Sequence, residues 1–393
     1  MRRLQLNTAG ESHGPGLTAI LTGLPMGLRL SAAAIDRELA RRQEGAGRGE
    51  RMAIEHYRVR ITGGLRRGRT LGGPLCLHVD NADHANWERA MSPLPRRGPA
   101  PAPVTLSRPG HADLAGVLKT GARDVRDVSE RASARETAAR VAAGAACKAL
   151  LAELGVAVFS HVVAIGGVGA HPDAGDPAAL AAAAAGNDLH VADPEAERRM
   201  RRTIKSVCGD GDTLGGIAEA VATGLPPGLG HYAAWDQRLD GRLAQAALSI
   251  PGVKGVEIGD AFAAARMRGS RVHDEILPHP KAEPGELRTR RPSNRAGGLE
   301  GGMTNGQPLV LRAAMKPIAS LAKPLRSVDL ATGRAARAAR ERGDCVAVPA
   351  MGVVLEAMTA LVLADAILEQ FGGDTMRDLK AAWRRYRTRQ AKR

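Results

Sequence analysis

Aromatic residues are scarce in this chain of 393 residues. Phe, Trp and Tyr together make up 2% of the sequence, with three of each. Proteins that bind single-stranded nucleic acids stack the bases on aromatic side chains, and this sequence offers few such platforms. Hydrophobic residues still make up 44% of the chain. We therefore expect a large core built from Ala, Val, Leu and Ile.

Cysteines are also few, and their spacing is uninformative for metal binding. The four positions contain no Cys-x-x-Cys pair; they are Cys76, Cys147, Cys208 and Cys345. We therefore expect neither a metal site nor a disulfide framework. Cysteine usage of this kind fits a reducing cytoplasm.

The sequence lacks an uninterrupted apolar segment of membrane-spanning length. The stretch from Met351 to Leu368 is the most apolar, but it contains Glu356 and Asp365. This pattern indicates a buried helix rather than a membrane span. We expect a cytoplasmic protein that does not interact with membranes.

Positive charge is in excess. The chain has 56 Lys and Arg residues against 41 Asp and Glu residues, a net charge of +15. Such a chain attracts polyanions, with nucleic acid as the first suspect. The arginines are spread through glycine-rich loops, which favours a small, multiply charged ligand and no nucleic acid. A basic nucleic-acid-binding protein remains the alternative because residues 376–393 are arginine-rich.

The hydrophobic pattern predicts an α+β protein with one large domain at 1–375 and a basic C-terminal tail at 376–393. The 47 glycines indicate many turns and close backbone approaches. Helices are expected from Ser31, at 133–154, at 239–249 and at 350–370. Strands are expected at 4–8, 16–22, 59–61, 75–79, 156–168, 254–258 and 309–314.

Two histidines lie in turn-forming sequences. His13 is flanked by glycines in Gly-Glu-Ser-His-Gly, and His111 follows Pro109 and Gly110. An imidazole titrates near pH ~6.5, so two of them in one cleft can give and take protons at neutral pH. Asp113 is suited to orient His111. Each motif alone also fits a packed or solvated histidine.

Other segments are suited to bind a phosphate group or to balance its charge. Residues 130–133, Glu-Arg-Ala-Ser, precede a helix, whose free N–H groups bind anions well, although a plain capped helix fits equally. The glycine-rich stretch 295–306 suits either a flat ligand or a pair of tight turns. Asp344 lies beside Arg342, after an expected arginine-rich helix, and is suited to act as a base or to orient one.

Taken together, these segments resemble the chorismate synthase family over nearly the whole chain. The motifs are long and stand in the family's order: GESHG at 10–14, RPGHADLAG at 108–116, ERASARETAARVAAG at 130–144, GDTLGG at 211–216, KGVEIGDAF at 254–262, SNRAGGLEGGMTNG at 293–306, KPIAS at 316–320 and RGDCVAVPA at 342–350.

The resemblance implies an activity and a fold. Members convert 5-enolpyruvylshikimate 3-phosphate into chorismate and phosphate, the last common step of aromatic amino-acid synthesis. This 1,4-anti elimination needs reduced FMN but causes no net redox change. The implied fold is a β-α-β sandwich, with helices packed between two antiparallel sheets, in a homotetramer. NADPH bound by the protein or a separate flavin reductase would supply the electrons, and the sequence leaves both open.

The resemblance also implies roles for residues. His13 would assist the departure of phosphate, His111 would protonate the region of the reduced flavin, and Asp344 would help relay the proton from C6. Arg42 and Arg48 would hold the substrate or NADPH. The FMN site would be lined by Arg131, Ala132, Ser133, Pro251, Gly252, Gly301, Lys316, Pro317, Ile318, Ala319, Ser320 and Arg342. Many members have Gln-Ala at 251–252, so only backbone contacts would survive there.

Two further alternatives remain open. An inactive paralogue would keep the architecture, but His13, His111 and Asp344 are all present. A flavin oxidoreductase would need a site for a hydride acceptor, and none can be located in the sequence.

Overall fold

The computed structural model describes residues 3–49, 54–99, 101–172, 175–283, 286–340 and 343–392. One antiparallel sheet, with strand order β1-β2-β6-β3, is formed near the N-terminus. Its strands are β1 (Gln5–Ala9), β2 (Gly16–Thr22), β3 (Val59–Gly63) and β6 (Leu75–Asp80). Alternating burial along β6 shows that one face of this sheet faces the core.

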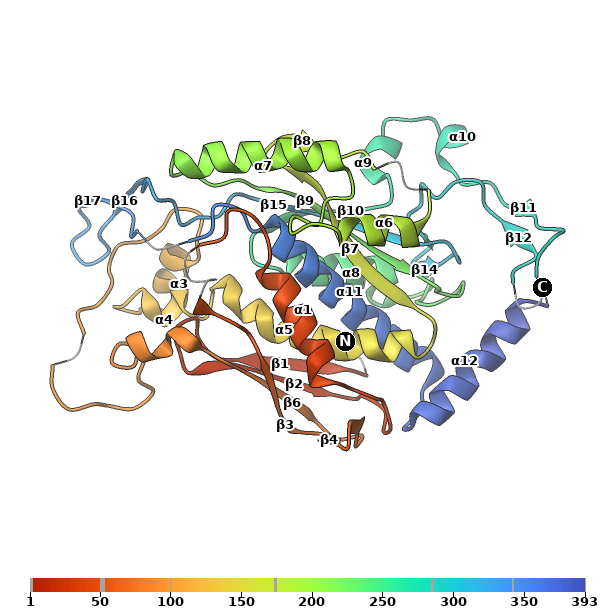
Figure 1. Ribbon diagram of the computed structural model, residues 1–393, viewed down its shortest axis with the longest axis horizontal. Coiled ribbons are helices and arrows are strands. Elements are labelled where there is room, and N and C mark those ends of the chain that lie inside the picture. Colours follow the sequence, from red (N-terminus) through yellow and green to blue (C-terminus); the bar gives the residue numbers. More distant parts are fainter. Residues whose placement is uncertain are drawn as a thin grey trace.

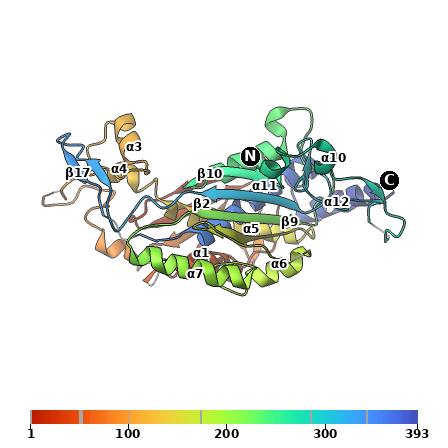
Figure 2. The ribbon, with the colours of Figure 1, turned by 90° about the horizontal axis from the view of Figure 1, so that it is seen from above.

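A second antiparallel sheet lies across the core, with strand order β10-β15-β9-β7-β8. Its strands are β7 (Ala157–Ile165), β8 (Val168–Gly169), β9 (Gly216–Thr223), β10 (Val253–Ile258) and β15 (Leu309–Met315). Helices α6 (Pro177–Ala184) and α7 (Pro194–Gly209) pack against β7 and β8 (Figures 1 and 2). They cover an edge that would otherwise expose unpaired backbone groups.

Helices fill the space between the two sheets (Figure 1). Helix α5 (Thr137–Ala152) packs on β2 and β6, whereas α11 (Val348–Phe371) packs on β7 and β9. Helix α1 (Ala32–Gln43) contacts both α5 and α11, and α8 (Leu239–Leu248) lies between α11 and β10. The β-α-β sandwich expected from the sequence is confirmed.

The remaining elements are short or lie at the periphery. The helices are α3 (Asp113–Thr120), α4 (Arg126–Ser129), α9 (Ala261–Ala264), α10 (Gly269–Val272) and α12 (Met376–Gln390), with 3-10 turns at Ala82–Asn86, Ala134–Glu136 and Trp235–Gln237. The strands pair as hairpins: β4 (Leu65–Arg66) with β5 (Arg69–Thr70), β11 (Leu277–Pro278) with β12 (Thr289–Arg290), β13 (Leu299–Glu300) with β14 (Met303–Thr304), and β16 (Arg326–Val328) with β17 (Ala335–Arg337).

Helix α11 is long and apolar enough to cross a membrane by length and composition, yet it is buried within the protein. The carboxylate of Glu356 in this helix is bound by Arg41, Lys148 and Ser160. Asp365 accepts the backbone N–H of Leu4 at 2.7 Å and pairs with Arg242 at 2.6 Å. Both buried charges are therefore neutralised, and they tie α11 to β1, α1, α5, β7 and α8.

Two interpretations of the sequence need correction. The segment expected as a helix at 133–154 begins with the 3-10 turn Ala134–Glu136, and the α-helix itself starts at Thr137. The Ser133 hydroxyl caps this turn by accepting the N–H of Arg135, and the Glu136 carboxylate binds Arg140. The arginine-rich helix expected before residue 342 is instead the β16–β17 hairpin. Its turn is closed by Asp329, whose carboxylate accepts the N–H of Ala331.

Close packing of α5 on α11 depends on Gly144. A Cβ atom added at Gly144 would lie 2.4 Å from the Cβ of Ala357 and 2.7 Å from its Cα. These are backbone-level contacts between two buried helices, so no side chain can move aside. The alanine- and glycine-rich sequence of α5 therefore permits a helix–helix approach that larger residues would prevent.

We expect Gly144→Ala to destabilise the protein by about 1–3 kcal/mol, because the added methyl group forces α5 away from α11. Gly241→Ala is the matched control, since α8 is also helical there and nothing lies within 4 Å of its added Cβ. That change should stabilise the protein by up to about 1 kcal/mol. Urea unfolding followed by circular dichroism measures both, and equal effects of the two substitutions would contradict the packing argument.

Candidate active site

Three helix ends meet at one end of the sandwich. The starts of α5 and α11 lie on the same side, near α3 and α4 (Figure 1). Arg42, in the last turn of α1, reaches this point and donates to the Thr137 hydroxyl at 3.0 Å and to the Ala134 carbonyl at 2.9 Å. Because helix starts carry partial positive charge, the two N-termini and Arg42 form a region suited to anions.

His13 is held by Glu130 in the loop between β1 and β2. Its Nδ1 lies 2.7 Å from Glu130 Oε1, and its backbone N–H donates to Glu130 Oε2 at 2.7 Å. The imidazole also stacks on Trp87, with 3.9 Å between ring centroids. A carboxylate at Nδ1 selects the tautomer that carries its proton there, so Nε2 is the nitrogen directed away from Glu130.

His111 is held in the same manner by Asp113, the first residue of α3. Its Nδ1 lies 2.5 Å from Asp113 Oδ1, and Arg108 makes a two-pronged ion pair with the same carboxylate at 2.8 and 3.0 Å. Burial alone would raise the pKa of Asp113, but hydrogen bonds from His111 and Arg108 lower that pKa well below its usual range. Asp113 therefore stays ionised and fixes the orientation of the imidazole.

The two histidine–carboxylate pairs are linked through adjoining helices. Asp113 starts α3, Glu130 directly follows α4, and these helices pack together. The contact is tight, because a Cβ at Gly116 would lie 2.2 Å from a methyl group of Val128. The packing of α3 on α4 thus connects the pair at His13 with the pair at His111, although the two histidines are 98 positions apart in the printed sequence.

Arg48 and Asp344 lie close to Arg42. Arg48 pairs with Asp344 at 3.0 Å, and the other Asp344 oxygen accepts the N–H of Gly49 at 2.7 Å. Burial lowers the pKa of Arg42, and nearby Arg48 lowers it further, whereas Tyr57 and Asp344 raise it. Positive charge is therefore concentrated here, where a ligand with several negative charges would relieve it.

The segment 316–320 joins the same network. The Lys316 N–H donates to the Gly252 carbonyl at 3.0 Å, and Arg108 reaches the Ser320 hydroxyl at 3.5 Å. A Cβ at Gly343 would lie 3.2 Å from the Cβ of Ser320, which places this segment beside Asp344. Pro317, Ile318 and Ala319 lie within the same loop after β15. The hydrogen bond from Lys316 to Gly252 thus places Pro251 and Gly252 next to Lys316, as a single site formed by both segments requires.

The segment 131–133 lies at the start of α5, beside the loop that carries His13. Arg131 donates to the Thr8 carbonyl at 2.7 Å and to the Gly10 carbonyl at 3.1 Å. Ala132 donates its N–H to Val128, and the Ser133 hydroxyl caps the 3-10 turn that follows. The side chain of Arg131 is 42% exposed, so it remains accessible to a ligand.

One of the expected site residues, Gly301, is not brought into this network. Gly301 lies in the β13–β14 hairpin, and its neighbour Gly302 accepts the N–H of Leu239 at the start of α8. Gly252 lies just after the C-terminal end of α8, and a ten-residue helix is about 15 Å long. Gly301 and Gly252 are therefore near opposite ends of α8. Arg342 lies outside the described residues.

Sequence reasoning overlooked two residues of the site. Glu130 stands in the quoted motif Glu-Arg-Ala-Ser, but its carboxylate turns back to His13 rather than toward the helix. The sequence signal available for Glu130 as a site residue was its position directly before Arg131. Trp87 directly follows the 3-10 turn Ala82–Asn86, and no pattern in the sequence relates it to His13.

Cys208 and Cys345 form a disulfide, contrary to the expectation of no such bond. The bond connects the end of α7 to the residue after Asp344, and the Cys345 N–H donates to the Gly47 carbonyl at 2.7 Å. The two cysteines are 137 positions apart, so the pair forms only through the fold. Cys76 and Cys147 are free thiols.

The charges in this region fit a phosphate. Burial and the nearby ammonium of Lys254 lower the pKa of Lys316. An anion between or beside these two lysines would offset both effects, which is the behaviour expected of a phosphate site. Among the described residues, no three His, Cys, Asp or Glu side chains are placed to share a metal ion.

Comparisons with known proteins agree on one family. A profile described as chorismate synthase matches residues 4–368. A chorismate synthase of Rubrobacter xylanophilus is 54% identical over 391 residues, covering 98% of this chain and 97% of the relative. One from Thermus thermophilus is 54% identical over 383 residues, covering 97% and 98%. A crystal structure of chorismate synthase superposes with a TM-score of 0.80 at 40% identity, covering 100% of both chains.

We expect Asp113→Asn to lower the free energy of unfolding by about 3–5 kcal/mol at pH 7, because it leaves the buried guanidinium of Arg108 without its carboxylate. The folded-state pKa of Asp113 is depressed, so its contribution is complete above the unfolded pKa of ~3.9 and is lost as pH falls below that value. The difference from the parent should therefore be constant between about pH 7 and 5 and shrink in more acidic solution.

Urea unfolding at a series of pH values tests this expectation. Asp80→Asn serves as the control, since Asp80 is 69% exposed and its pairing with Arg60 is a surface contact. That substitution should change stability by less than about 1 kcal/mol. A gap between Asp113→Asn and the parent that widens toward low pH would show that the sign is wrong.

Proposed function

This chain belongs to the chorismate synthase family, and we propose that it catalyses the 1,4-anti elimination of phosphate from 5-enolpyruvylshikimate 3-phosphate to give chorismate. Chorismate synthases are carbon–oxygen lyases, and the chain is an enzyme of this class. The observation that supports the reaction most directly is the pair of imidazoles, each held at Nδ1 by its own carboxylate, beside a cluster of arginines.

The elimination breaks the C–O bond to phosphate and the C6–H bond, and a new C=C bond forms. We assign His13 to protonate the departing phosphate, since Glu130 fixes the tautomer and orientation of its ring. His111, held by Asp113, supplies the proton that the flavin region needs. Asp344, paired with Arg48, assists removal of the proton from C6. Each of these roles follows the family motif and the contacts that orient the side chain.

Reduced FMN, when bound, would supply electron density to the substrate without net redox change. The described residues fit such a group, because Lys316 and Lys254 form a cationic pair that an anion would relieve. We propose that the segment 316–320 holds the flavin together with Arg131, Ala132, Ser133 and the backbone of 251–252. Gly301 and Arg342 remain candidates for this site from the family motif alone.

Arginine explains how several anions share one site. Substrate and FMN each carry a phosphate, and the substrate adds carboxylates, so the anions repel one another unless cations intervene. Arg42 and Arg48 are suited to this, because guanidinium groups bind phosphates and carboxylates with fixed geometry. Arg42 is already fixed by Thr137 and Ala134, so it presents little conformational freedom. The same two residues would hold NADPH if the protein reduces its own flavin.

The extent of the catalytic unit, its location, its assembly and its electron source are part of the same proposal. We place the catalytic unit in residues 1–375 and the reaction in the cytoplasm, as the last common step of aromatic amino-acid synthesis. A homotetramer is the assembly that the family suggests. Electrons for FMN would come either from NADPH bound to this protein or from a separate flavin reductase.

An anaerobic assay tests the activity. Purified protein is mixed with 5-enolpyruvylshikimate 3-phosphate and dithionite-reduced FMN, and released phosphate is measured. We expect release with reduced FMN and none with oxidised FMN, because only the reduced flavin donates electron density. Absence of release with reduced flavin present would remove the enzymatic proposal.

We expect His13→Ala and His111→Ala to lower kcat by about 10²–10⁴ with smaller effects on KM, because each loses a proton-transfer group. Their pH–rate profiles should differ from the parent and from each other. His171→Ala is the control, since His171 is exposed on the loop after β8 and should leave the profile unchanged. Identical profiles for the parent and both active-site variants would rule out the assigned roles.

We expect Lys316→Ala to weaken binding of FMN by about tenfold while changing riboflavin binding little, because one charged hydrogen bond to the phosphate is lost. Quenching of flavin fluorescence measures both affinities. Lys205→Ala, an exposed lysine on α7, provides the control. An equal loss of FMN and riboflavin affinity would show that Lys316 does not contact the phosphate.

A further inference from the structure

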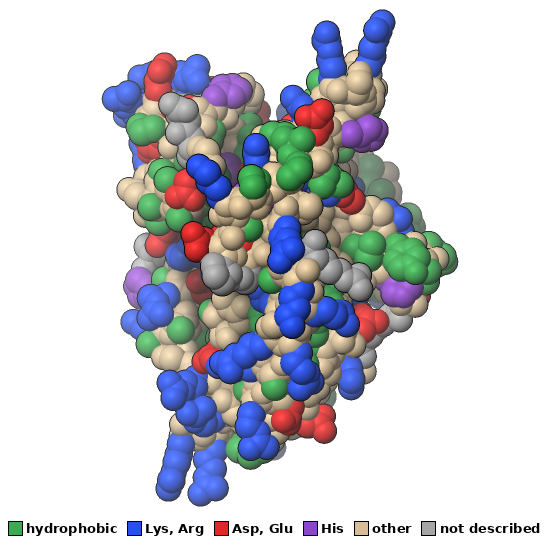
Figure 3. Space-filling view, turned by 90° about the vertical axis from the view of Figure 1, so that its right-hand side faces the viewer, with side chains coloured by type: hydrophobic (Ala, Val, Ile, Leu, Met, Phe, Trp, Pro, Cys, Tyr) green, Lys and Arg blue, Asp and Glu red, His purple; other side chains and the backbone are tan. Residues whose placement is uncertain are grey.

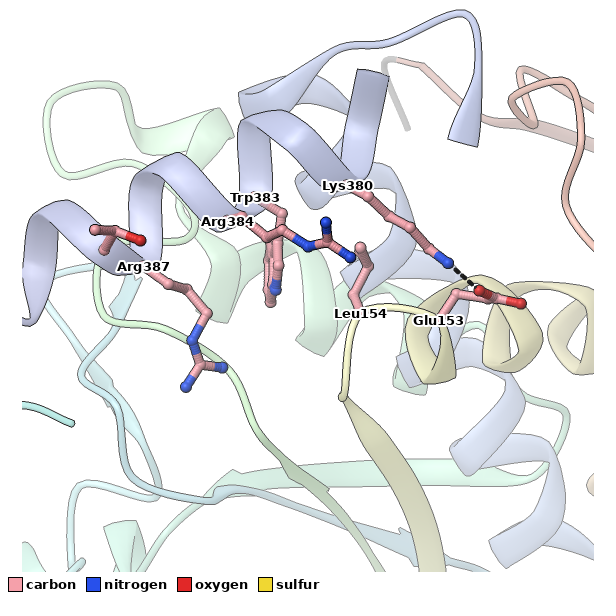
Figure 4. A pocket seen from close by; sticks show the side chains of 7 residues that line it. Glu153, Leu154, Lys380, Trp383, Arg384 and Arg387 are labelled. Atoms are coloured by element: carbon pink, nitrogen blue, oxygen red, sulfur yellow. Dashed lines mark hydrogen bonds and ion pairs between the residues drawn. The ribbon is translucent and has the colours of Figure 1, made fainter. Parts of the chain in front are cut away.

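The basic C-terminal segment forms one wall of a cleft that the proposed function does not use. Two adjoining cavities, of about 400 and 460 Å³, are both lined by Glu153, Lys380 and Arg384. Figure 4 shows Lys380 and Arg384 extending from α12 toward Glu153, which follows α5. We call the two cavities together the α12 cleft.

Helix α12 is anchored by its apolar face, so its cationic side chains have a fixed direction. Trp383 is buried and meets Phe371 edge to face, with ring centroids 5.2 Å apart. The Tyr386 hydroxyl donates to the Pro227 carbonyl at 2.9 Å. On the other face, the positions that line the cleft are spaced three or four residues apart, which places them on one side of the helix: Arg377, Lys380, Arg384 and Arg387.

The opposite wall comes from the β4–β5 hairpin and the segment between β2 and α1. Arg29 and Arg69 line the cleft and are paired through an antiparallel bridge of their backbones. The Arg69 guanidinium donates to the Gly27 carbonyl at 3.0 Å, which holds it near the cleft. Cations that are more than 300 positions apart in the chain therefore face the same space.

Negative charge in the α12 cleft is insufficient to balance these cations. Among the described residues that line it, Glu153 is the single carboxylate, and it pairs with Lys380. The hydrogen bond from Lys380 lowers the pKa of Glu153, and the charges of Arg29 and Arg69 lower it further. Figure 3 shows Lys and Arg side chains gathered on this end of the molecule. The described residues that line the cleft therefore carry more positive than negative charge.

We propose that the α12 cleft binds a small oligophosphate, a ligand carrying two or more linked phosphate groups. The cations are distributed along two connected cavities, which suits linked phosphates better than a single one. The combined space is in the range of small-molecule sites. Nucleic acid is disfavoured because the one aromatic residue lining the cleft, Trp383, is buried and offers no ring for base stacking.

This site is separate from the active site. In both ribbon views α12 lies at the end of the molecule away from α3, α4 and β17 (Figures 1 and 2). The family match ends at residue 368, before α12 begins. The proposed reaction therefore does not account for the charges of α12, and the inference stands without it.

Isothermal titration at near-physiological salt tests the proposal with inorganic tripolyphosphate, pyrophosphate and phosphate as probes. We expect affinity to rise with the number of linked phosphates. Arg384→Ala and Lys380→Ala should each weaken tripolyphosphate binding by about tenfold, because each removes a charged contact. Glu153→Gln should tighten binding severalfold, since it removes the carboxylate that competes for Lys380. A misfolded variant would not show this gain.

Two controls locate the site. Arg385→Ala removes an exposed charge of α12 that does not line the cleft, so it should leave affinity unchanged. FMN binding should be the same in Arg384→Ala and the parent. An equal loss in Arg385→Ala and Arg384→Ala would show diffuse attraction and overturn the proposal. Binding of single-stranded RNA by the parent protein, without binding of tripolyphosphate, would also overturn the proposal.

Discussion

The approach of α5 to α11 is the constraint on which the rest of this structure depends. Gly144 lets the two helices meet at backbone distance between the sheets, and the buried carboxylate of Glu356 ties α11 to α1, α5 and β7. Because both helices start on the same side, their positive ends point at one region. Arg131 and Ser133 precede α5 there, and Asp344 precedes α11. Packing in the middle layer therefore positions the candidate active site.

Within that region, each histidine is held by a carboxylate, and Arg108 also lies 3.0 Å from Nδ1 of His111. Glu130 and Asp113 each bind Nδ1 of one imidazole and so determine which ring nitrogen faces away. The arginines act on charge: Arg108 keeps Asp113 ionised, and Arg48 pairs with Asp344. In the proposed mechanism, proton transfer and anion binding fall to different side chains that share one network. The excess charge of α12 is spatially distinct from this network and belongs to the cleft at the other end of the molecule.

Much of the fold follows from local patterns in the sequence. Ser31 before α1, the glycines after α11 and the alternation along β2 and β6 mark elements that the structure places within a few residues of their expected limits. The errors have a common origin. Residues 335–337, Ala-Ala-Arg, are good helix formers, but the turn at Asp329 directs them into a hairpin. Strand β9 was overlooked because its burial on both sides removes the alternation that identifies strands.

The sequence by itself predicted which residues carry the chemistry: His13, His111, Asp344 and the arginines stand in motifs that are readable without coordinates. It also determined that α11 is buried, since Glu356 and Asp365 interrupt its apolar run. Only the tertiary structure decided which carboxylate holds which histidine, that Cys208 meets Cys345, and that Arg29 and Arg69 face α12. These contacts join segments separated by tens to hundreds of residues, and their geometry is set by helix and sheet packing, which no local pattern encodes.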